Sequence, residues 1–197
     1  MTSQPALDQA KMEAFVHKVL GDTSAALTMT LAAIGDRLGL FRDLAANGPA
    51  TSVELATANA RAAGIADRVR FEQRDVSTGL PQQYDIITTF DVVHDAVDPV
   101  GLLRTVRQGI RADGIYVCLD INCSDKLQEN QGPLGAMFHG FSVLYCMTTS
   151  LAGGGMGLGT LGFHEPKVRE LCAEAGFSSV RRVPLENPFN NLYEIRP

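Results

Sequence analysis

An apolar strand, an amphipathic helix and a second apolar strand follow one another in the middle of this 197-residue chain, and they limit its fold most. Tyr84–Phe90 is apolar and β-branched almost throughout, and residues 115–119 form a similar run. Between them, Pro99 suits the first turn of a helix whose apolar residues share one face. Two strands joined in this way pair in parallel through a right-handed crossover. The pattern therefore predicts an α/β domain.

The segments around this unit extend the prediction. Residues 69–71 begin an alternation typical of a strand, and residues 165–176 indicate a helix ended by Gly176. Two last strands, at residues 180–185 and 192–195, are separated by a turn-rich segment, so a terminal antiparallel hairpin is expected. Residues 121–163 contain many glycines and no sustained period. The apolar residues there suit either a buried helix or the lining of a substrate pocket.

The first 56 residues favour a small helical module. Asp8 can cap a first helix, and residues 21–23 predict a break followed by a second helix that Gly39 ends. A further helical turn covers residues 40–44, and residues 51–54 form a capping box that opens another helix. The apolar residues that set these helical periods are Met12, Phe15, Val16, Val19, Leu20, Leu27, Leu31, Ile34 and Leu38.

Composition excludes several classes of protein. The formal net charge is −5 and no basic cluster is present, which argues against nucleic acid as a partner. No apolar stretch reaches the roughly 20 residues that span a bilayer, and no secretory signal is visible. The four cysteines show no paired spacing, which favours reduced thiols and a cytoplasmic protein.

Residues 57–197 resemble the second half of a class I S-adenosylmethionine-dependent methyltransferase, a Rossmann-like domain. The resemblance rests on Asp75 after the strand at residues 69–74, on the strand that ends at Phe90 and Asp91, and on the turns at residues 112–114 and 174–177. It implies adenine contacts by Asp75 and the backbone amide of Val76. It also implies that Phe90, Asp91 and His94 lie beside the cofactor.

Residues 38–44 and 48–56 resemble the winged-helix segment that precedes small-molecule methyltransferases. That segment implies a homodimer and a pocket for a small-molecule methyl acceptor. The expected division of the chain is therefore a partial winged-helix module at residues 1–56 and the C-terminal part of the methyltransferase domain at residues 57–197.

The front half of the resembled domain is missing from the sequence. A strand, a G-x-G-x-G turn, a helix and a second strand ending in an acid should precede the helix at Thr57. Glycines in such a turn let the backbone approach a ligand, and the helix behind it offers free amides. We therefore expect an internal deletion near residues 55–58, an incomplete sheet, and weak or lost S-adenosylmethionine binding. A non-catalytic remnant that acts in dimerisation is the alternative, and exposed strand edges predict a less stable, dimeric or aggregation-prone chain.

Residues 157–162 match G-x-G-x-x-G, which would suit a nicotinamide-dependent oxidoreductase. In a dinucleotide site the last glycine enters a helix directly, whereas residues 163–166 intervene here. A loop or lid is the favoured interpretation.

Asp91, His94, Asp95 and Asp98 form an acidic cluster around one histidine. Such residues can bind a metal, but a loop in which Asp98 caps the next helix is favoured, so no metal is predicted. His94 is a weaker candidate for a general base, because its ordinary pKa lies near neutrality. Asp75 can equally be a turn cap.

Overall fold

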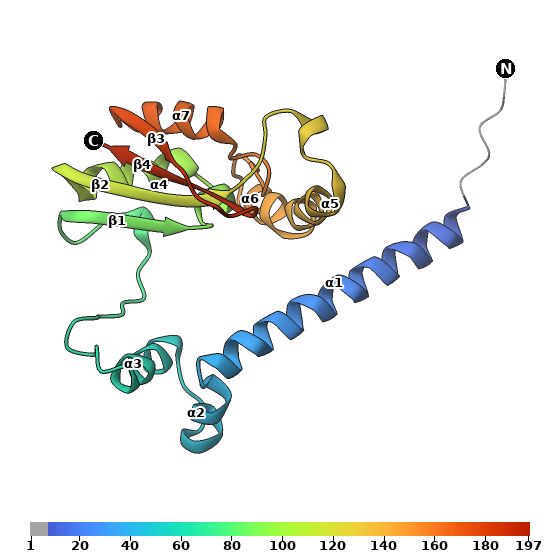
Figure 1. Ribbon diagram of the computed structural model, residues 1–197, viewed down its shortest axis with the longest axis horizontal. Coiled ribbons are helices and arrows are strands. Elements are labelled where there is room, and N and C mark those ends of the chain that lie inside the picture. Colours follow the sequence, from blue (N-terminus) through green and yellow to red (C-terminus); the bar gives the residue numbers. More distant parts are fainter. Residues whose placement is uncertain (1–7) are drawn as a thin grey trace. The chain divides into compact units, whose positions relative to one another are not determined.

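The computed structural model describes residues 8–197, which divide into two compact units, residues 8–74 and Asp75–Pro197 (Figure 1). Within the first helix, the side chains of Val16, Val19, Leu20, Leu27 and Leu31 lie outside the described residues. The division expected at residues 56 and 57 falls inside a helix of the first unit, and it stays a prediction about the origin of the two segments.

The first unit consists of three helices. The Asp8 carboxylate accepts a hydrogen bond from the Lys11 amide and begins α1, Gln9–Arg37. Gly39, with φ of 70°, separates α1 from α2, Leu40–Asn47. The predicted capping box between Thr51 and Glu54 is present and opens α3, Ser52–Ala62. The predicted break at residues 21–23 is wrong, because α1 runs through them; an interior glycine destabilises a helix by only about 1 kcal/mol.

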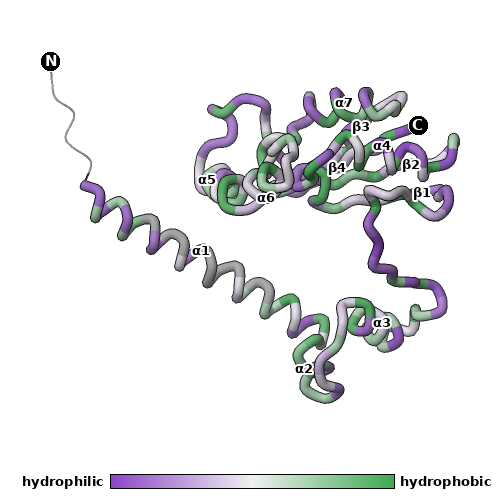
Figure 2. The backbone as a smooth tube through the Cα atoms, turned by 180° about the vertical axis from the view of Figure 1, so that it is seen from behind, coloured by the Kyte–Doolittle hydropathy of each residue, from purple (hydrophilic) through white to green (hydrophobic). Residues whose placement is uncertain are grey.

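The strand expected at residues 69–71 is also wrong. No strand forms there, and Val69 and Phe71 are each 38% exposed. Charged residues lie between and after these two, and Glu72 forms ion pairs with both Arg70 and Arg74. Figure 2 shows a largely hydrophilic connection between α3 and the next strand. The segment therefore offers too little apolar surface to dock as a strand.

The second unit contains a four-stranded sheet in the order β1-β2-β4-β3. β1, Tyr84–Phe90, pairs in parallel with β2, Ile110–Ile121, through α4, Pro99–Gly109, which confirms the predicted crossover. β3, Ser179–Val183, and β4, Asn190–Arg196, form the predicted antiparallel hairpin, and β4 lies against β2. No strand among the described residues pairs with the outer edge of β1.

The predicted turn at residues 112–114 is an irregularity inside β2. Tyr84 faces Ile110, whereas Ile86 faces Ile115, so β2 contains extra residues at this point. A Cβ on Gly114 would lie 2.9 Å from the Asp85 carbonyl oxygen. The close approach of the two strands therefore requires glycine.

The core lies on one face of this sheet, under α4 and α7, Glu165–Glu174 (Figure 1). Residues from both helices pack on alternate residues of β2 and β4, and the fully buried ones include Leu103, Tyr116, Val168, Leu171, Tyr193 and Ile195. On β1, the residues that point to the opposite face are exposed, with Ile86 at 61% and Phe90 at 60%. One face of β1 thus lacks the covering that a parallel strand usually has.

Residues 121–163 are more ordered than their composition indicates. They contain α5, Gly132–Phe141, and α6, Met147–Ala152, joined by a π-helical segment, Ser142–Cys146. Phe138 and Cys146 are buried, whereas Val143, Leu144 and Tyr145 are more than half exposed. Glycine-rich helices lack a clear apolar period, so the sequence did not distinguish them from loops. Among the described residues, no helix has the length and apolar character needed to cross a membrane.

Candidate functional site

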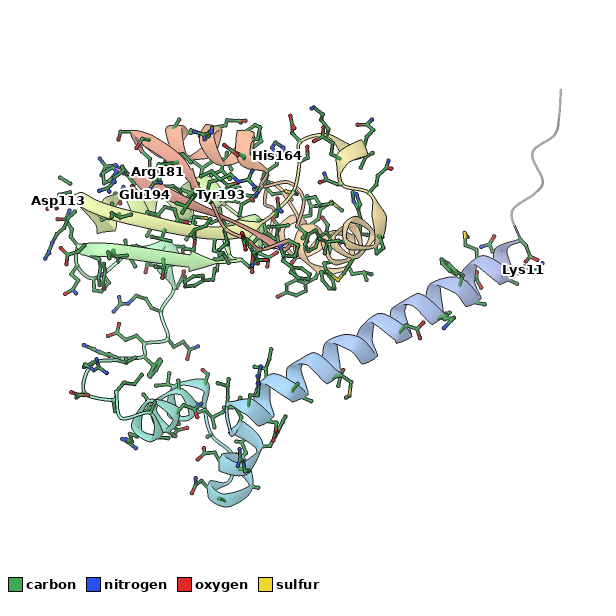
Figure 3. All side chains as sticks on the ribbon, in the orientation of Figure 1. Lys11, Asp113, His164, Arg181, Tyr193 and Glu194 are labelled. Atoms are coloured by element: carbon green, nitrogen blue, oxygen red, sulfur yellow. The ribbon has the colours of Figure 1, made fainter. Side chains whose placement is uncertain are left out.

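A polar cluster lies at the edge of the sheet where β1 and β2 end. Asp91 follows the last residue of β1, and the short 3-10 turn η2, Val93–Asp95, then brings His94 inward. Asp120 lies near the end of β2. Carboxyl ends of parallel strands share one edge of a sheet, which is where such folds place their ligands. Asp113, in the irregular part of β2, marks the opposite end of the sheet (Figure 3).

His94 and Asp120 form a buried pair. His94 Nδ1 lies 2.6 Å from Asp120 Oδ1, and the two residues are 4% and 0% exposed. Asp120 Oδ1 also accepts a hydrogen bond from the Ile121 amide at 2.8 Å. On the other side of the imidazole, His94 Nε2 is 3.3 Å from Asp95 Oδ1. The carboxylate therefore favours the tautomer with hydrogen on Nδ1, which leaves Nε2 able to accept a proton.

The charges around His94 control its ionisation. Burial lowers the pKa of His94, but the hydrogen bond and charge of Asp120, with the charges of Asp95 and Asp91, outweigh burial, so the pKa is raised. A histidine with a raised pKa is a stronger base than a free imidazole, and it holds its second proton up to a higher pH.

Asp91 occupies an unusual backbone conformation at the end of β1. Its φ is 51°, and its amide donates to the Leu119 carbonyl at 2.9 Å. Its carboxylate accepts a hydrogen bond from Asn190 Nδ2 at 2.7 Å. Burial and the charge of Asp120 raise the pKa of Asp91. The structure thus joins Asp91 to the His94 cluster, as the sequence predicts, and adds Asn190 from β4, for which the sequence offered no signal.

The remaining predicted cofactor residues are exposed. Asp75 accepts hydrogen bonds from the amide and hydroxyl of Ser77 at 2.9 and 2.6 Å, and these bonds lower its pKa. It begins the 3-10 turn η1, Val76–Thr78, so the capping role holds. Val76 is 41% and Phe90 60% exposed. In the described part of the chain, the side-chain hydrogen bonds of Asp75 stay within its own turn, and its cofactor role stays a prediction.

Cys146 brings a thiol to the same cluster, where the sequence analysis had given it no role. Its Sγ accepts a hydrogen bond from Thr160 Oγ1 at 3.0 Å. Ligand atoms of His94, Asp95 and Cys146 lie within 4.8 Å of one another, as do those of Asp91, His94 and Asp120. Such groupings can hold a cation, but hydrogen bonding between His94 and Asp120 already explains their approach, and we assign no metal.

The glycine-rich segment is tied to the loop after β1. Ser150 Oγ donates to the Ala96 carbonyl and accepts from the Gly157 amide, and the Met156 amide donates to the Val97 carbonyl. Phe163 and His164 separate Gly162 from α7, so this glycine does not enter the helix directly. Nicotinamide binding stays an untested hypothesis.

A family described as a methyltransferase domain matches residues 49–152, more than half of the chain. The chain belongs to this methyltransferase domain family. O-demethylpuromycin-O-methyltransferase of Streptomyces alboniger is 29% identical over 146 residues, which cover 72% of this chain and 35% of that enzyme.

Solved methyltransferase structures share the fold. An O-methyltransferase family 2 protein from Planctomyces limnophilus, in complex with apigenin, has a TM-score of 0.55 and 20% identity over 73% of this chain and 40% of its own. The mitomycin 7-O-methyltransferase MmcR has a TM-score of 0.52 and 19% identity, covering 73% of this chain and 38% of that one. The methyltransferase domain described here thus spans about a third to two fifths of the length of these relatives.

The weak or lost S-adenosylmethionine binding expected from the sequence stays a prediction. It rests on the glycine-rich turn and the ribose-binding acid that the resembled domain has before the position of Thr57 and that this sequence does not show. The Asp75 carboxylate is engaged by its own turn, and β1 has no outer neighbour in the described residues. What remains is an exposed aromatic ring, Phe90, beside Asp91.

Proposed function

We propose that this chain is the acceptor-side part of an S-adenosylmethionine-dependent O-methyltransferase for a small-molecule acceptor. The buried pair of His94 and Asp120 carries this proposal. A methyl acceptor with a hydroxyl group must lose a proton, and an imidazole oriented by a carboxylate is well suited to remove it. The similar enzymes that act on hydroxyl groups, such as O-demethylpuromycin-O-methyltransferase, support the choice of oxygen as nucleophile.

In this proposal, His94 accepts the proton at Nε2. Its Nδ1–H donates to Asp120, whose negative charge stabilises the imidazolium that forms. Asp95, 3.3 Å from Nε2, is placed to orient the incoming hydroxyl or the charged ring. Asp120 does not take up the proton itself and acts by positioning His94.

Cofactor binding by this chain alone is weak or lost in the proposed function. The adenine wall would consist of Asp75, Val76 and Phe90, all exposed, with Asp91 and His94 beside them. By titration calorimetry with S-adenosylmethionine and S-adenosylhomocysteine, we expect a dissociation constant of about 1 mM or weaker. A low-micromolar dissociation constant, together with loss of binding in Phe90→Ala, would show that the cofactor site is complete.

An internal deletion near residues 55–58 explains the missing cofactor motif in this proposal. The proposal rests on the sequence, in which the glycine-rich turn expected before Thr57 is not found; the match of 72% of this chain to 35% of the similar Streptomyces enzyme shows only that the chain is shorter than that relative. The segment before the junction would then be a partial winged-helix module. Sequencing the gene across codons 55–58 in the source organism tests this; an intervening coding segment would identify the deletion as an artefact of the gene boundaries.

A non-catalytic dimerisation protein is the second candidate. Two observations favour it: the unpaired outer edge of β1, and exposed apolar residues along α1, with Phe15 at 66% and Met29 at 71%. Unpaired strand edges and large apolar side chains favour association. Sedimentation equilibrium of the full chain tests the homodimer, and a monomeric mass at all concentrations would exclude it.

A further inference from the structure

A cavity in the second unit shares no lining residue with the His94 cluster. It has a volume of about 500 Å³ and is bounded by the loop after β2, the start of α5, the start of α7 and the β3–β4 hairpin. Its polar lining residues include Asp125, Glu129, Glu165 and Arg182, and its apolar ones include Leu134 and Phe138. A cavity of this volume is large enough for a small organic molecule.

The walls of this cavity are fixed by internal contacts. The Asn130 side chain accepts from the Ser124 amide at 2.8 Å and donates to the Ser124 carbonyl at 2.7 Å. Phe138 is buried and packs edge-on against Phe189, with ring centroids 6.4 Å apart. Ligand sites are usually preformed in this way, because an ordered wall loses less entropy when a ligand binds.

The charges of the lining include one cation, Arg182, with a long and shared ion pair, and one anion, Asp125, with no ion pair among the described residues. Glu129 pairs with Lys126 at 3.0 Å, and Glu165 pairs with Arg169 at 2.7 Å. Arg182 is only 3.6 Å from Glu165 at its nearest, and its side chain is half exposed. Among the described residues, Asp125 forms no ion pair within 4 Å, although it lies in the field of Lys126. Its hydrogen bond from Ser124 Oγ is long, at 3.4 Å.

Tyr193 adds an unsatisfied polar group next to Arg182. The two residues lie directly opposite each other in the antiparallel β3–β4 pair, so their side chains share one face. Tyr193 is fully buried, and its hydroxyl has no hydrogen-bond partner in the described part of the chain. Burial raises the pKa of this phenol to about 12, the Asn191 side chain opposes that shift, and Glu165 and Arg182 are among the charges acting on it. Tyr193 is not a lining residue of the cavity, whereas its charged neighbours Glu165 and Arg182 are.

We propose that this cavity binds a small zwitterion, namely an α-amino acid with an apolar side chain. Its carboxylate pairs with Arg182 and its ammonium group with Asp125, while the apolar side chain packs against Phe138 and Leu134. A guanidinium binds a carboxylate through two parallel hydrogen bonds, which suits Arg182. A purely anionic ligand would meet three acidic lining residues, and a purely cationic one would leave Arg182 with only its long, shared pair to Glu165.

The test uses three matched probes on the full chain: L-phenylalanine, phenethylamine without the carboxylate, and 3-phenylpropionate without the ammonium group. Titration followed by NMR chemical shifts should show saturable binding of L-phenylalanine. Each truncated probe should bind about tenfold more weakly or worse, because each leaves one charge unpaired. Absence of saturable L-phenylalanine binding, or equal binding of either truncated probe, would overturn the proposal.

Two arginine variants place the site. Arg182→Gln should weaken L-phenylalanine binding about tenfold or more, whereas Arg181→Gln should leave it unchanged. Arg181 is the matched control, because it pairs with Glu194 on the opposite face of the hairpin (Figure 3). Near-ultraviolet circular dichroism verifies that both variants fold. Equal effects of the two substitutions would also overturn the assignment, and neither result depends on methyl transfer or cofactor binding.

Discussion

Replacing Asp120 tests the interaction on which the proposed proton acceptor depends. Asp120→Ala leaves His94 buried without its acceptor and removes the partner of the Ile121 amide. Breaking a buried charged pair from one side destabilises a protein by about 3–5 kcal/mol. Asp120→Asn keeps the shape and one acceptor oxygen but removes the charge, for which we expect about 1–3 kcal/mol.

The same substitutions change how stability depends on pH. Folded His94 has a raised pKa, so the folded state binds more protons near neutrality than the unfolded state. The contribution of His94 to the free energy of unfolding is therefore complete below about pH 6.5, the pKa of histidine in the unfolded chain. It is lost as the pH rises through the pKa of His94 in the folded protein. Each pKa unit by which folding raises the value contributes about 1.4 kcal/mol to the free energy of unfolding. In Asp120→Asn the carboxylate charge no longer opposes the effect of burial on the pKa of His94, so the loss of stability with rising pH should shrink or disappear.

Urea denaturation between pH 6 and 8.5, followed by tyrosine circular dichroism, measures both effects. The chain has four tyrosines and no tryptophan, and all four lie in the unit that contains the site. Asp113→Asn is the control, because Asp113 is exposed at the opposite end of the sheet (Figure 3). Asp113→Asn should leave the pH dependence of the free energy of unfolding unchanged. If Asp120→Asn also leaves it unchanged, the charge of Asp120 does not raise the pKa of His94, and the reasoning is refuted.

Three further predictions concern the fold. Gly114→Ala should destabilise the second unit by about 1–3 kcal/mol in the same urea assay, because its Cβ would press on Asp85; an unchanged midpoint would contradict this. Thr51→Ala removes a cap worth about 1 kcal/mol, so first-turn amides of α3 should exchange about fivefold faster, with no change in the second unit. Ile86→Lys should reduce any self-association seen in sedimentation velocity, whereas an unaffected mass would place the contact elsewhere.

The elements with strong local signals could be predicted from the sequence. Tyr84–Phe90 is apolar and β-branched, and Pro99 begins an amphipathic helix, so the crossover follows from composition and spacing. Gly39 and the Thr51 capping box set helix ends through their own backbone and side-chain bonds. In each case the determining interaction lies within a few residues of the chain, which is what local pattern detects.

The errors have two physical causes. Gly21 does not interrupt α1 because one interior glycine destabilises a helix by only about 1 kcal/mol, and the apolar residues at 69 and 71 do not form a strand because strand formation depends on a neighbour and on buried apolar surface. The helix at residues 132–141 has two further glycines after its first residue, and one of them, Gly135, lies against the Asn130 backbone. Its glycines reflect a close contact that the sequence alone does not reveal.

The site was predicted in part for the same reason. His94 and Asp91 follow a recognisable strand, so their position at its end could be inferred. Asp120 carried a weaker signal, an acid directly after an apolar run, and only the parallel pairing of β1 with β2 shows that it meets His94. Cys146 and Asn190 come from a helix and a strand far along the chain, and no local pattern connects them to this edge.

The proposed proton-accepting pair and the proposed cofactor site differ in how many secondary-structure elements they need. His94 and Asp120 belong to one parallel crossover, β1–α4–β2, which supplies both side chains, their burial and their spacing. A cofactor that spans several strand ends needs neighbours on the outer side of β1, and the described chain has none there. Loss of those neighbours would therefore abolish cofactor binding without disturbing the buried pair of His94 and Asp120. Stability measurements on Asp120 variants and cofactor titrations should accordingly give independent answers.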